Sequence, residues 1–246
     1  MFKAGKLKSD PRFKLTLDKL ARLQVTCGLH TRKEKLLVWK LAEQTREGAI
    51  VEIGSFEGYS TILLAEAANT CTKIFAIDPH VGKLCESDEE ESHFTGDTWQ
   101  TFNKNIQYAG VANKIRALKL KSEEAVLNWR NPIGLLFIDG SHKYEDVKKD
   151  VLLWKPHLIP GGVVVFHDLW ISGVRKVITE RILSDNTFGD FAYAPCCMFA
   201  ARYFGDKYVY QILQRNFWRL LLRLRGTIEK WRMLRRWLHV LLRRVS

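Results

Sequence analysis

Short apolar runs and helix-periodic segments alternate along most of the chain. Continuous apolar runs, which are typical of strands buried on both faces, occupy residues 49–53, 73–77, 114–120, 133–139 and 163–168. Between these runs, apolar residues at three- and four-residue steps predict helices at 59–68, 98–110, 122–129, 143–154 and 174–183. Because parallel strands are joined by crossover helices, this order predicts an α/β fold in which helices cover both faces of a mostly parallel sheet.

Capping residues set the expected ends of several helices. A capping box that begins at Thr31 opens a helix before the first strand, and Gly48 is placed to end it. Asp97 and Gly110 bracket a later helix, and Ser122 is the expected cap of the one after it. The remaining breaks predict an exposed acidic loop at 85–94 and a turn made by Pro156, Pro160, Gly161 and Gly162. Residues 191–204 are expected to close the sheet as a hairpin or as paired strands.

Positive charge is concentrated at the C-terminal end. The net charge is +12, of which residues 215–246 carry +9 (nine Arg, one Lys and one Glu), so the rest carries only 12 − 9 = +3. Apolar residues of this tail recur at helical spacing, and most of its arginines fall off that stripe. The pattern predicts a basic amphipathic helix. Such a helix could lie on an anionic membrane surface, pack on its own domain or a second copy, or bind nucleic acid.

Three parts of the chain are expected: a helical lead-in at 1–48, the α/β core at 49–204 and the tail at 205–246. The five Cys are odd in number and lack the spacing of a disulfide framework, which favours a reducing cytoplasm. Cys196 and Cys197 fit two small apolar strand residues better than a redox or metal pair. No apolar signal region or run of about 20 apolar residues is present. We therefore expect a cytoplasmic protein, with peripheral membrane association through the tail as the alternative.

The first predicted strand ends in a combination of acids and glycines, VEIGSFEGYS. Gly54 and Gly58 allow a tight turn and close approach to a ligand at the carboxyl edge of the sheet. Glu52 and Glu57 would repel a pyrophosphate but suit a cationic ligand. Asp78 ends the second strand, where it can accept both hydroxyls of a ribose. A cationic nucleoside without phosphate describes S-adenosylmethionine (SAM).

Four motifs in this order resemble the class I SAM-dependent methyltransferases. Within them the chain is similar to the small-molecule and sugar O-methyltransferase branch that includes macrocin O-methyltransferase-like and cephalosporin hydroxylase-like proteins. The resemblance covers residues 28–204 and rests on VEIGSFEGYST, FAIDPH, LKSEEA, and FIDGSHKYEDVKKDV followed by LIPGGVVVFHD. It implies a Rossmann-like, doubly wound sheet of seven strands. It also implies cofactor contacts by Glu52, Gly54 and Ser60 at the methionine end, Asp78 at the ribose, Ser122 and Glu123 near the adenine, and further contacts by Ser55, Gly58 and Asp139.

Polar residues also follow the fourth and fifth predicted strands, where Asp139, His142, His167 and Asp168 would share the carboxyl edge of the sheet. Two Asp with one or two His suit a hard or borderline divalent cation. The resemblance implies Asp139 and Asp168 as ligands of such an ion, with Mg²⁺ expected. His167 stands where this branch often carries an acid, so we expect either a third ligand or a residue that orients one. His142 is the expected general base and Lys143 its substitute, while a capping or surface histidine is the alternative.

These features together predict a SAM-dependent O-methyltransferase that acts on a hydroxyl of a sugar, glycolipid or secondary metabolite. An RNA-directed methyltransferase is less favoured, because the Asn/Asp-Pro-Pro-aromatic motif of base-amine enzymes is replaced by Ile-Asp-Gly-Ser at 138–141. A non-catalytic SAM-fold binding protein is a third interpretation, and a hydroxylase-like activity a fourth. Homo-oligomer formation is left open.

Overall fold

The computed structural model of the chain describes residues 10–23, 25, 28–29, 31–81, 86–87, 90–91, 97–194, 197–205 and 216–224. The helices are α1 (Pro11–Leu20), α2 (Arg32–Gln44), α3 (Tyr59–Ala67), α4 (Thr98–Tyr108), α5 (Ser122–Ala125), α6 (Tyr144–Trp154) and α7 (Ser172–Val177). The strands are β1 (Ala49–Ile53), β2 (Ile74–Ile77), β3 (Glu86–Ser87), β4 (Glu90–Glu91), β5 (Ile115–Leu118), β6 (Ile133–Ile138), β7 (Leu158–Phe166), β8 (Phe188–Ala194) and β9 (Met198–Tyr203). Short helical turns are η2 (Ala112–Lys114), η3 (Val126–Asn128), η4 (Lys155–His157) and the π-helical η5 (Ile178–Ile182). A further helix spans 216–224.

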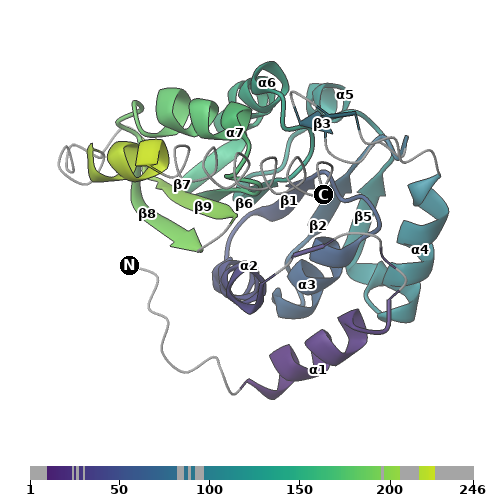
Figure 1. Ribbon diagram of the computed structural model, residues 1–246. Coiled ribbons are helices and arrows are strands. Elements are labelled where there is room, and N and C mark those ends of the chain that lie inside the picture. The colour runs from purple at the N-terminus through teal and green to yellow at the C-terminus, as the bar shows by residue number, and fades with distance from the viewer. Residues whose placement is uncertain are drawn as a thin grey trace, which may run out of the picture.

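Seven strands form one sheet in the order β5-β2-β1-β6-β7-β9-β8 (Figure 1). The five strands from β5 to β7 are parallel, and β9 runs antiparallel to both of its neighbours. The predicted mostly parallel, seven-stranded Rossmann-like fold is therefore confirmed. The chain order reverses between β1 and β6, and ligands of open α/β sheets bind beside such a switch point at the carboxyl ends of the strands.

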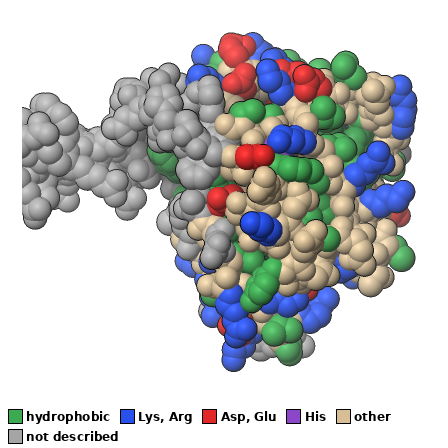
Figure 2. Space-filling view, turned by 90° about the vertical axis from the view of Figure 1, so that its right-hand side faces the viewer, with side chains coloured by type: hydrophobic (Ala, Val, Ile, Leu, Met, Phe, Trp, Pro, Cys, Tyr) green, Lys and Arg blue, Asp and Glu red, His purple; other side chains and the backbone are tan. Residues whose placement is uncertain are grey.

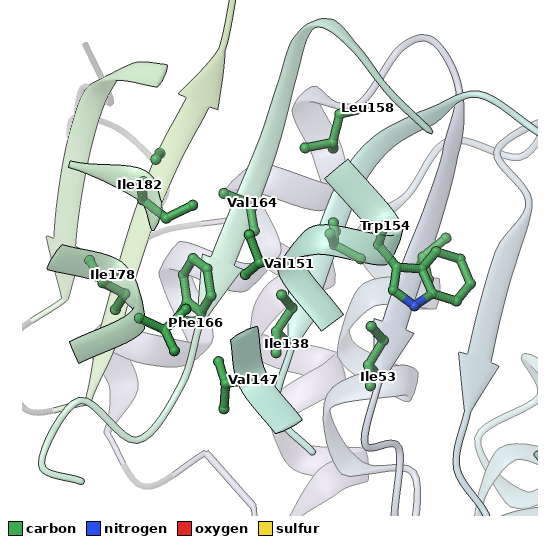
Figure 3. Packing of buried hydrophobic residues seen from close by; sticks show 14 of the residues in the cluster. Ile53, Ile138, Val147, Val151, Trp154, Leu158, Val164, Phe166, Ile178 and Ile182 are labelled. Carbon is green, nitrogen blue, oxygen red and sulfur yellow. The ribbon is translucent and has the colours of Figure 1, made fainter. Parts of the chain in front are cut away.

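Each central strand contributes side chains to two hydrophobic cores, one on each face of the sheet, because successive side chains point to opposite faces. One core packs against α6, α7 and η5, and Figure 3 shows it through Ile53, Ile138, Val147, Val151, Trp154, Val164, Phe166, Ile178 and Ile182. The other core, which includes Ile50, Phe137 and Val165, packs against α1 to α4. Helix α1 is joined to α2 by an edge-to-face contact of Phe13 with Trp39, whose ring centroids lie 5.3 Å apart.

Two expected caps are placed differently. Helix α2 ends at Gln44 with Thr45 as its C-cap, so Gly48 does not end it. Gly48 instead leads into β1 with a φ of 74°, where a Cβ atom would lie 2.6 Å from the backbone nitrogen of Gly134. Ser122 is the first residue of α5 and not its cap. At the N-cap, the backbone N–H of Lys121 donates to Glu124 Oε2 at 3.0 Å, and the Ser122 hydroxyl is used in a tertiary contact described below.

Two expected breaks contain strand structure. Pro160, Gly161 and Gly162 lie inside β7, where the register with β6 shifts between Ile133 and Leu135 and the strand pairing is irregular. The acidic stretch at 85–94 contains β3 and β4, which pair in antiparallel fashion. The helix expected at 174–183 is split into α7 and η5, whereas β8 and β9 form the expected antiparallel pair.

Only 216–224 of the predicted amphipathic tail belongs to the described residues, and 225–246 lie outside them. Among the helices that the structure describes, none combines the length and the apolar character needed to cross a membrane.

Candidate active site

A cavity of about 520 Å³ opens at the carboxyl edge of β1, β2 and β6. Its volume falls within the range of small-molecule and cofactor sites. Its walls include ten of the predicted site residues: Gly54, Ser55, Ser60, Asp78, Ser122, Glu123, Asp139, His142, Lys143 and Asp168. Glu52, Gly58 and His167 are not part of the lining, so the structure brings most but not all of the predicted residues to one surface.

The turn after β1 depends on Gly54. Its φ is 89°, and a Cβ atom there would lie 2.2 Å from the carbonyl oxygen of Asp139. The absence of a side chain therefore lets the ends of β1 and β6 approach each other at the cavity. Gly58 has a φ of 88° and is the N-cap of α3, where a Cβ atom would lie 3.1 Å from the ring of Phe102. It shapes the turn without lining the cavity.

Asp78 holds this turn against the end of β2. Its Oδ2 accepts a hydrogen bond from the backbone N–H of Phe56 at 2.9 Å, and its Oδ1 accepts one from the backbone N–H of His80 at 2.6 Å. Carboxylate oxygens can accept more than one hydrogen bond. The side chain of Asp78 can therefore brace the loop and still receive ligand hydroxyls from the cavity.

Glu52 lies beneath the turn and is fully buried. Its carboxyl group accepts hydrogen bonds from the hydroxyls of Thr61 and Ser60. Burial raises its pKa to about 8, although those two hydroxyls act in the opposite direction. Glu52 is thus mostly protonated at neutral pH and supports the start of α3 from below. Ser55, by contrast, lines the cavity, and its buried Oγ has no hydrogen-bond partner among the described residues.

The far end of the cavity is built by α5 and α6. The Ser122 hydroxyl accepts a hydrogen bond from Trp154 Nε1 at 2.7 Å and also bonds the carboxyl group of Asp150. Asp150 is buried, and burial raises its pKa to about 7 against the opposing bond from Ser122. Glu123 is paired with Lys149, whose Nζ lies 3.5 Å from Glu123 Oε1.

Asp139, His142 and Asp168 form the chemical centre. Their candidate ligand atoms all lie within 4.8 Å of one another. His142 Nε2 lies 2.8 Å from Asp168 Oδ2, and the other oxygen of Asp168 accepts a hydrogen bond from Trp170 Nε1 at 2.7 Å. Asp168 therefore fixes the orientation of the His142 ring.

His167 supports the two acids from behind. Its Nδ1 lies 3.2 Å from Asp139 Oδ1 and 3.2 Å from Asp168 Oδ2. Burial lowers the pKa of His167, but the two carboxylates outweigh burial and raise it to about 11. Burial likewise opposes ionisation of Asp168, yet hydrogen bonds from His142 and His167 hold its pKa well below the usual range. Both histidines therefore contact the acids: His142 lines the cavity and pairs with Asp168, whereas His167 lies outside the lining and contacts Asp139 and Asp168.

The opposite edge of the His167 ring faces a second buried group. Candidate ligand atoms of Glu34, His167 and Cys197 lie within 4.8 Å of one another. His167 Nε2 and Glu34 Oε1 are buried and have no hydrogen-bond partner within the described parts of the chain. Cys197 is buried at the start of β9, while its neighbour Cys196 lies outside the described residues.

Sequence reasoning missed Asp150, and it gave Trp170 no assigned role because a tryptophan after a strand is more often a packing residue. Asp150 falls on the apolar side of α6, together with the buried Val147, Val151 and Trp154. A carboxyl group among core positions of a helix is a detectable signal, because carboxylates are rarely fully buried unless they have a partner. Trp170 carries no comparable signal, since its role comes from a loop that returns its N–H to Asp168.

Three backbone positions around the cavity have unusual conformations. Phe56, His80 and Asp168 have φ values of 44°, 53° and 52°. Among the described residues other than glycine, Asp190 is the only further one with positive φ. Such conformations are uncommon for residues with a Cβ atom and tend to cluster at ligand sites.

Residues 51–169 match the family model Methyltransf_24, which describes a methyltransferase domain. The predicted resemblance to methyltransferases is therefore confirmed for this part of the chain. Two curated relatives are uncharacterized proteins. Protein y4gI of Sinorhizobium fredii is 30% identical over 133 residues, and R132 of Acanthamoeba polyphaga mimivirus is 32% identical over 152 residues. These matches cover 52% and 58% of this chain but only 14% and 62% of the relatives.

Solved O-methyltransferases share the fold. TomG from Streptomyces achromogenes, which is involved in tomaymycin synthesis and was crystallised with SAM, superposes with a TM-score of 0.57 at 18% identity. The superposition covers 80% of this chain and 91% of TomG. The O-methyltransferase from Bacillus cereus in complex with SAH gives a TM-score of 0.58 at 16% identity and covers 81% and 93%. At these identities the comparison establishes a common fold.

Proposed function

We propose that this methyltransferase-domain protein transfers a methyl group from SAM to a hydroxyl group of a small molecule. One observation carries the proposal: the glycine-containing turn after β1 and the centre of Asp139, His142 and Asp168 line the same cavity. The cavity lining has six carboxyl side chains besides Asp150, namely Glu57, Asp78, Glu123, Asp139, Asp146 and Asp168, against three lysines, Lys121, Lys143 and Lys149. Asp150 adds less charge, because burial raises its pKa to about 7. This balance suits a cationic sulfonium and disfavours a pyrophosphate.

The turn residues would hold the cofactor. Asp78 would receive the ribose hydroxyls, and Gly54, Ser55 and Ser60 would face the methionine end. Ser122 and Glu123 would lie near the adenine, where Asp150 adds a buried polar group. Placed in this way, the transferable methyl group would point toward Asp139 and His142, which share the cavity with the turn.

His142 would accept the proton of the acceptor hydroxyl. Its Nε2 is held by Asp168, so we assign proton transfer to Nδ1. His167 would keep Asp139 and Asp168 in place and balance part of their charge. Lys143 is the N-cap residue of α6 and exposed, and it remains the substitute base. Methyl transfer is a direct displacement at carbon, so the main contribution of these residues is alignment of the reacting groups.

The same centre suits a divalent cation, expected to be Mg²⁺. Asp139 and Asp168 place carboxylate oxygens within 4.8 Å of each other and of His142, and carboxylate oxygens are donors that hard or borderline ions bind. Asp139 and Asp168 would hold the ion, with His167 behind the acids and His142 beside them as the base. Such an ion would lower the pKa of the acceptor hydroxyl.

The acceptor class is proposed from the branch that the motifs resemble, namely sugars, glycolipids and secondary metabolites. The involvement of TomG in tomaymycin synthesis supports the last of these. A cell extract incubated with the purified protein and isotopically labelled SAM would identify the acceptor by mass spectrometry.

The variant Asp139→Ala tests the chemical centre. We expect it to abolish labelling while SAM binding, measured by calorimetry, is retained. If the ion is required, a chelator should inactivate the unmodified protein, and Mg²⁺ should restore it. Full labelling by Asp139→Ala would contradict the assigned centre, and failure of the unmodified protein to bind SAM would contradict the whole proposal.

A further inference from the structure

The helix at 216–224 has an inner face that packs on the sheet. Trp218 contacts Phe199 of β9 and Tyr193 of β8, with ring centroids 5.5 Å and 6.1 Å away. Leu222, one turn later, is almost fully buried and belongs to the core under α6 and α7. Figure 1 shows this helix in yellow beside β8. The helix is thereby fixed to the end of the sheet that is opposite β5.

Its outer face is apolar and exposed. Phe217, Leu220 and Leu224 are each more than half exposed, and their spacing of three and four residues places them on one side of the helix. We call these three residues the outer stripe. Single exposed apolar residues are ordinary, but three neighbours on one short helix indicate an interaction surface.

The surroundings of the outer stripe are strongly basic. Arg223 on the same helix is exposed, and Arg219 donates from its guanidinium to the carbonyl of Leu183 at 3.2 Å. The 22 residues that follow the helix contain six Arg, one Lys and one Glu, so they carry +6. Their apolar residues, such as Ile228, Trp231 and Leu238, continue the spacing of the outer stripe in sequence.

We propose that the outer stripe is a docking face for an anionic lipid bilayer. Apolar side chains flanked by arginines match the boundary between acyl chains and acidic headgroups. A second copy fits less well, because each copy would bring +9 to the contact. A nucleic acid would use the arginines but would leave the outer stripe in water, because phosphate contacts dominate such binding. The proposal does not depend on the transferase activity.

Co-sedimentation of the full chain with vesicles tests this surface. We compare vesicles of phosphatidylcholine alone with vesicles that also contain phosphatidylglycerol. The test variant is Phe217→Ser/Leu220→Ser/Leu224→Ser. The matched control is Leu15→Ser/Leu127→Ser/Leu152→Ser, which removes three similarly exposed apolar side chains from other helical segments. Melting temperatures of both variants establish that each remains folded.

We expect binding to the phosphatidylglycerol vesicles that weakens with salt. The outer-stripe variant should bind them at least about tenfold more weakly, because three apolar side chains no longer enter the bilayer, and the control should bind normally. Three results would overturn the proposal: no binding of the unmodified chain to either vesicle, equal loss in the control, or an outer-stripe variant that loses dimer formation or an RNA shift while vesicle binding is unchanged.

Discussion

At the residue scale, Asp168 connects most of the proposed chemistry. Its Oδ1 accepts a hydrogen bond from Trp170 Nε1, and its Oδ2 lies close to the ring nitrogens of both His142 and His167. A carboxylate with several nitrogen donors stays ionised and keeps its partners in fixed orientations. The ring of His142 is therefore positioned before any acceptor binds.

Replacement of His142 by asparagine tests its assigned role. We expect His142→Asn to lower kcat by about 10²- to 10⁴-fold, because general-base catalysis contributes on this order. The SAM dissociation constant should change little. Labelled methyl transfer at saturating SAM measures the effect, with His157→Asn in η4, outside the cavity lining, as the control. Equal activity of the two variants would assign the proton transfer elsewhere, with Lys143 as the next candidate.

At the element scale, the site depends on turns that bring strand ends together. The loop after β1 is held by Asp78 from β2, and its first glycine touches the loop after β6. The hydrophobic pattern predicts the strands themselves well, because their residues are buried on both faces and the apolar runs are continuous. Sequence pattern alone therefore predicts where these loops begin.

Gly54→Ala separates the effect of this close approach from that of backbone strain. A Cβ atom at residue 54 would lie 2.2 Å from Asp139 O, so β1 and β6 would have to move apart. Gly110→Ala is the matched control, because Gly110 also has positive φ but no atom within 4 Å of the added Cβ.

We expect Gly110→Ala to destabilise the fold by about 1–2 kcal/mol, the usual penalty of a left-handed residue with a side chain. Gly54→Ala should be more destabilising, and it should also abolish SAM binding. Thermal unfolding and calorimetry measure the two effects. Normal SAM binding by Gly54→Ala would show that the close contact between the loops is not needed for the cofactor site.

Tertiary contacts explain what the sequence did not predict at this scale. Ser122 has the residue type of a helix cap, yet its hydroxyl bonds Trp154 and Asp150 from α6. Gly48 looked like a helix stop but is needed where the backbones of β1 and β6 meet. Which histidine faces the cavity and which lies behind the acids also depends on where their side chains point after β6 and β7. Spacing along the chain does not determine those directions. Local pattern cannot reveal such long-range partners.

At the scale of the whole molecule, a hydrophobic core lies on each face of the sheet, and several carboxyl groups are buried together with these cores. On the face shown in Figure 2, acidic and basic side chains of the described residues are interspersed, in keeping with the small net charge outside the tail. The buried acids Glu52 and Asp150 differ from these surface groups, because burial favours their neutral forms. Global stability should therefore depend on pH.

Asp150→Asn tests this dependence. The pKa of Asp150 in the folded protein is about 7, above its ordinary value of 3.8, so folding favours the protonated form. The stabilisation that comes from protonated Asp150 in the folded protein is fully present below about pH 4, and it is lost as the pH rises toward 7. The stability of Asp150→Asn relative to the unmodified protein should thus increase over this range, by up to about 4 kcal/mol.

Urea unfolding at several pH values measures the difference. Glu145→Gln, which removes an exposed carboxyl group from the same helix, is the control for the loss of one negative charge. A stability difference between Asp150→Asn and the unmodified protein that is the same at every pH would contradict the assigned titration.

The left-handed backbone at Phe56, His80 and Asp168 has a consequence for laboratory evolution. Glycine tolerates that conformation without strain, so replacement of any of the three should relax the local backbone. At Asp168 and the buried His80, lost hydrogen bonds and packing would outweigh this relief, whereas Phe56 is only half-buried. A screen that rewards heat resistance alone would then accept glycine at residue 56 and alter the rim of the cavity. Selection schemes for this protein need to score turnover and thermal tolerance together.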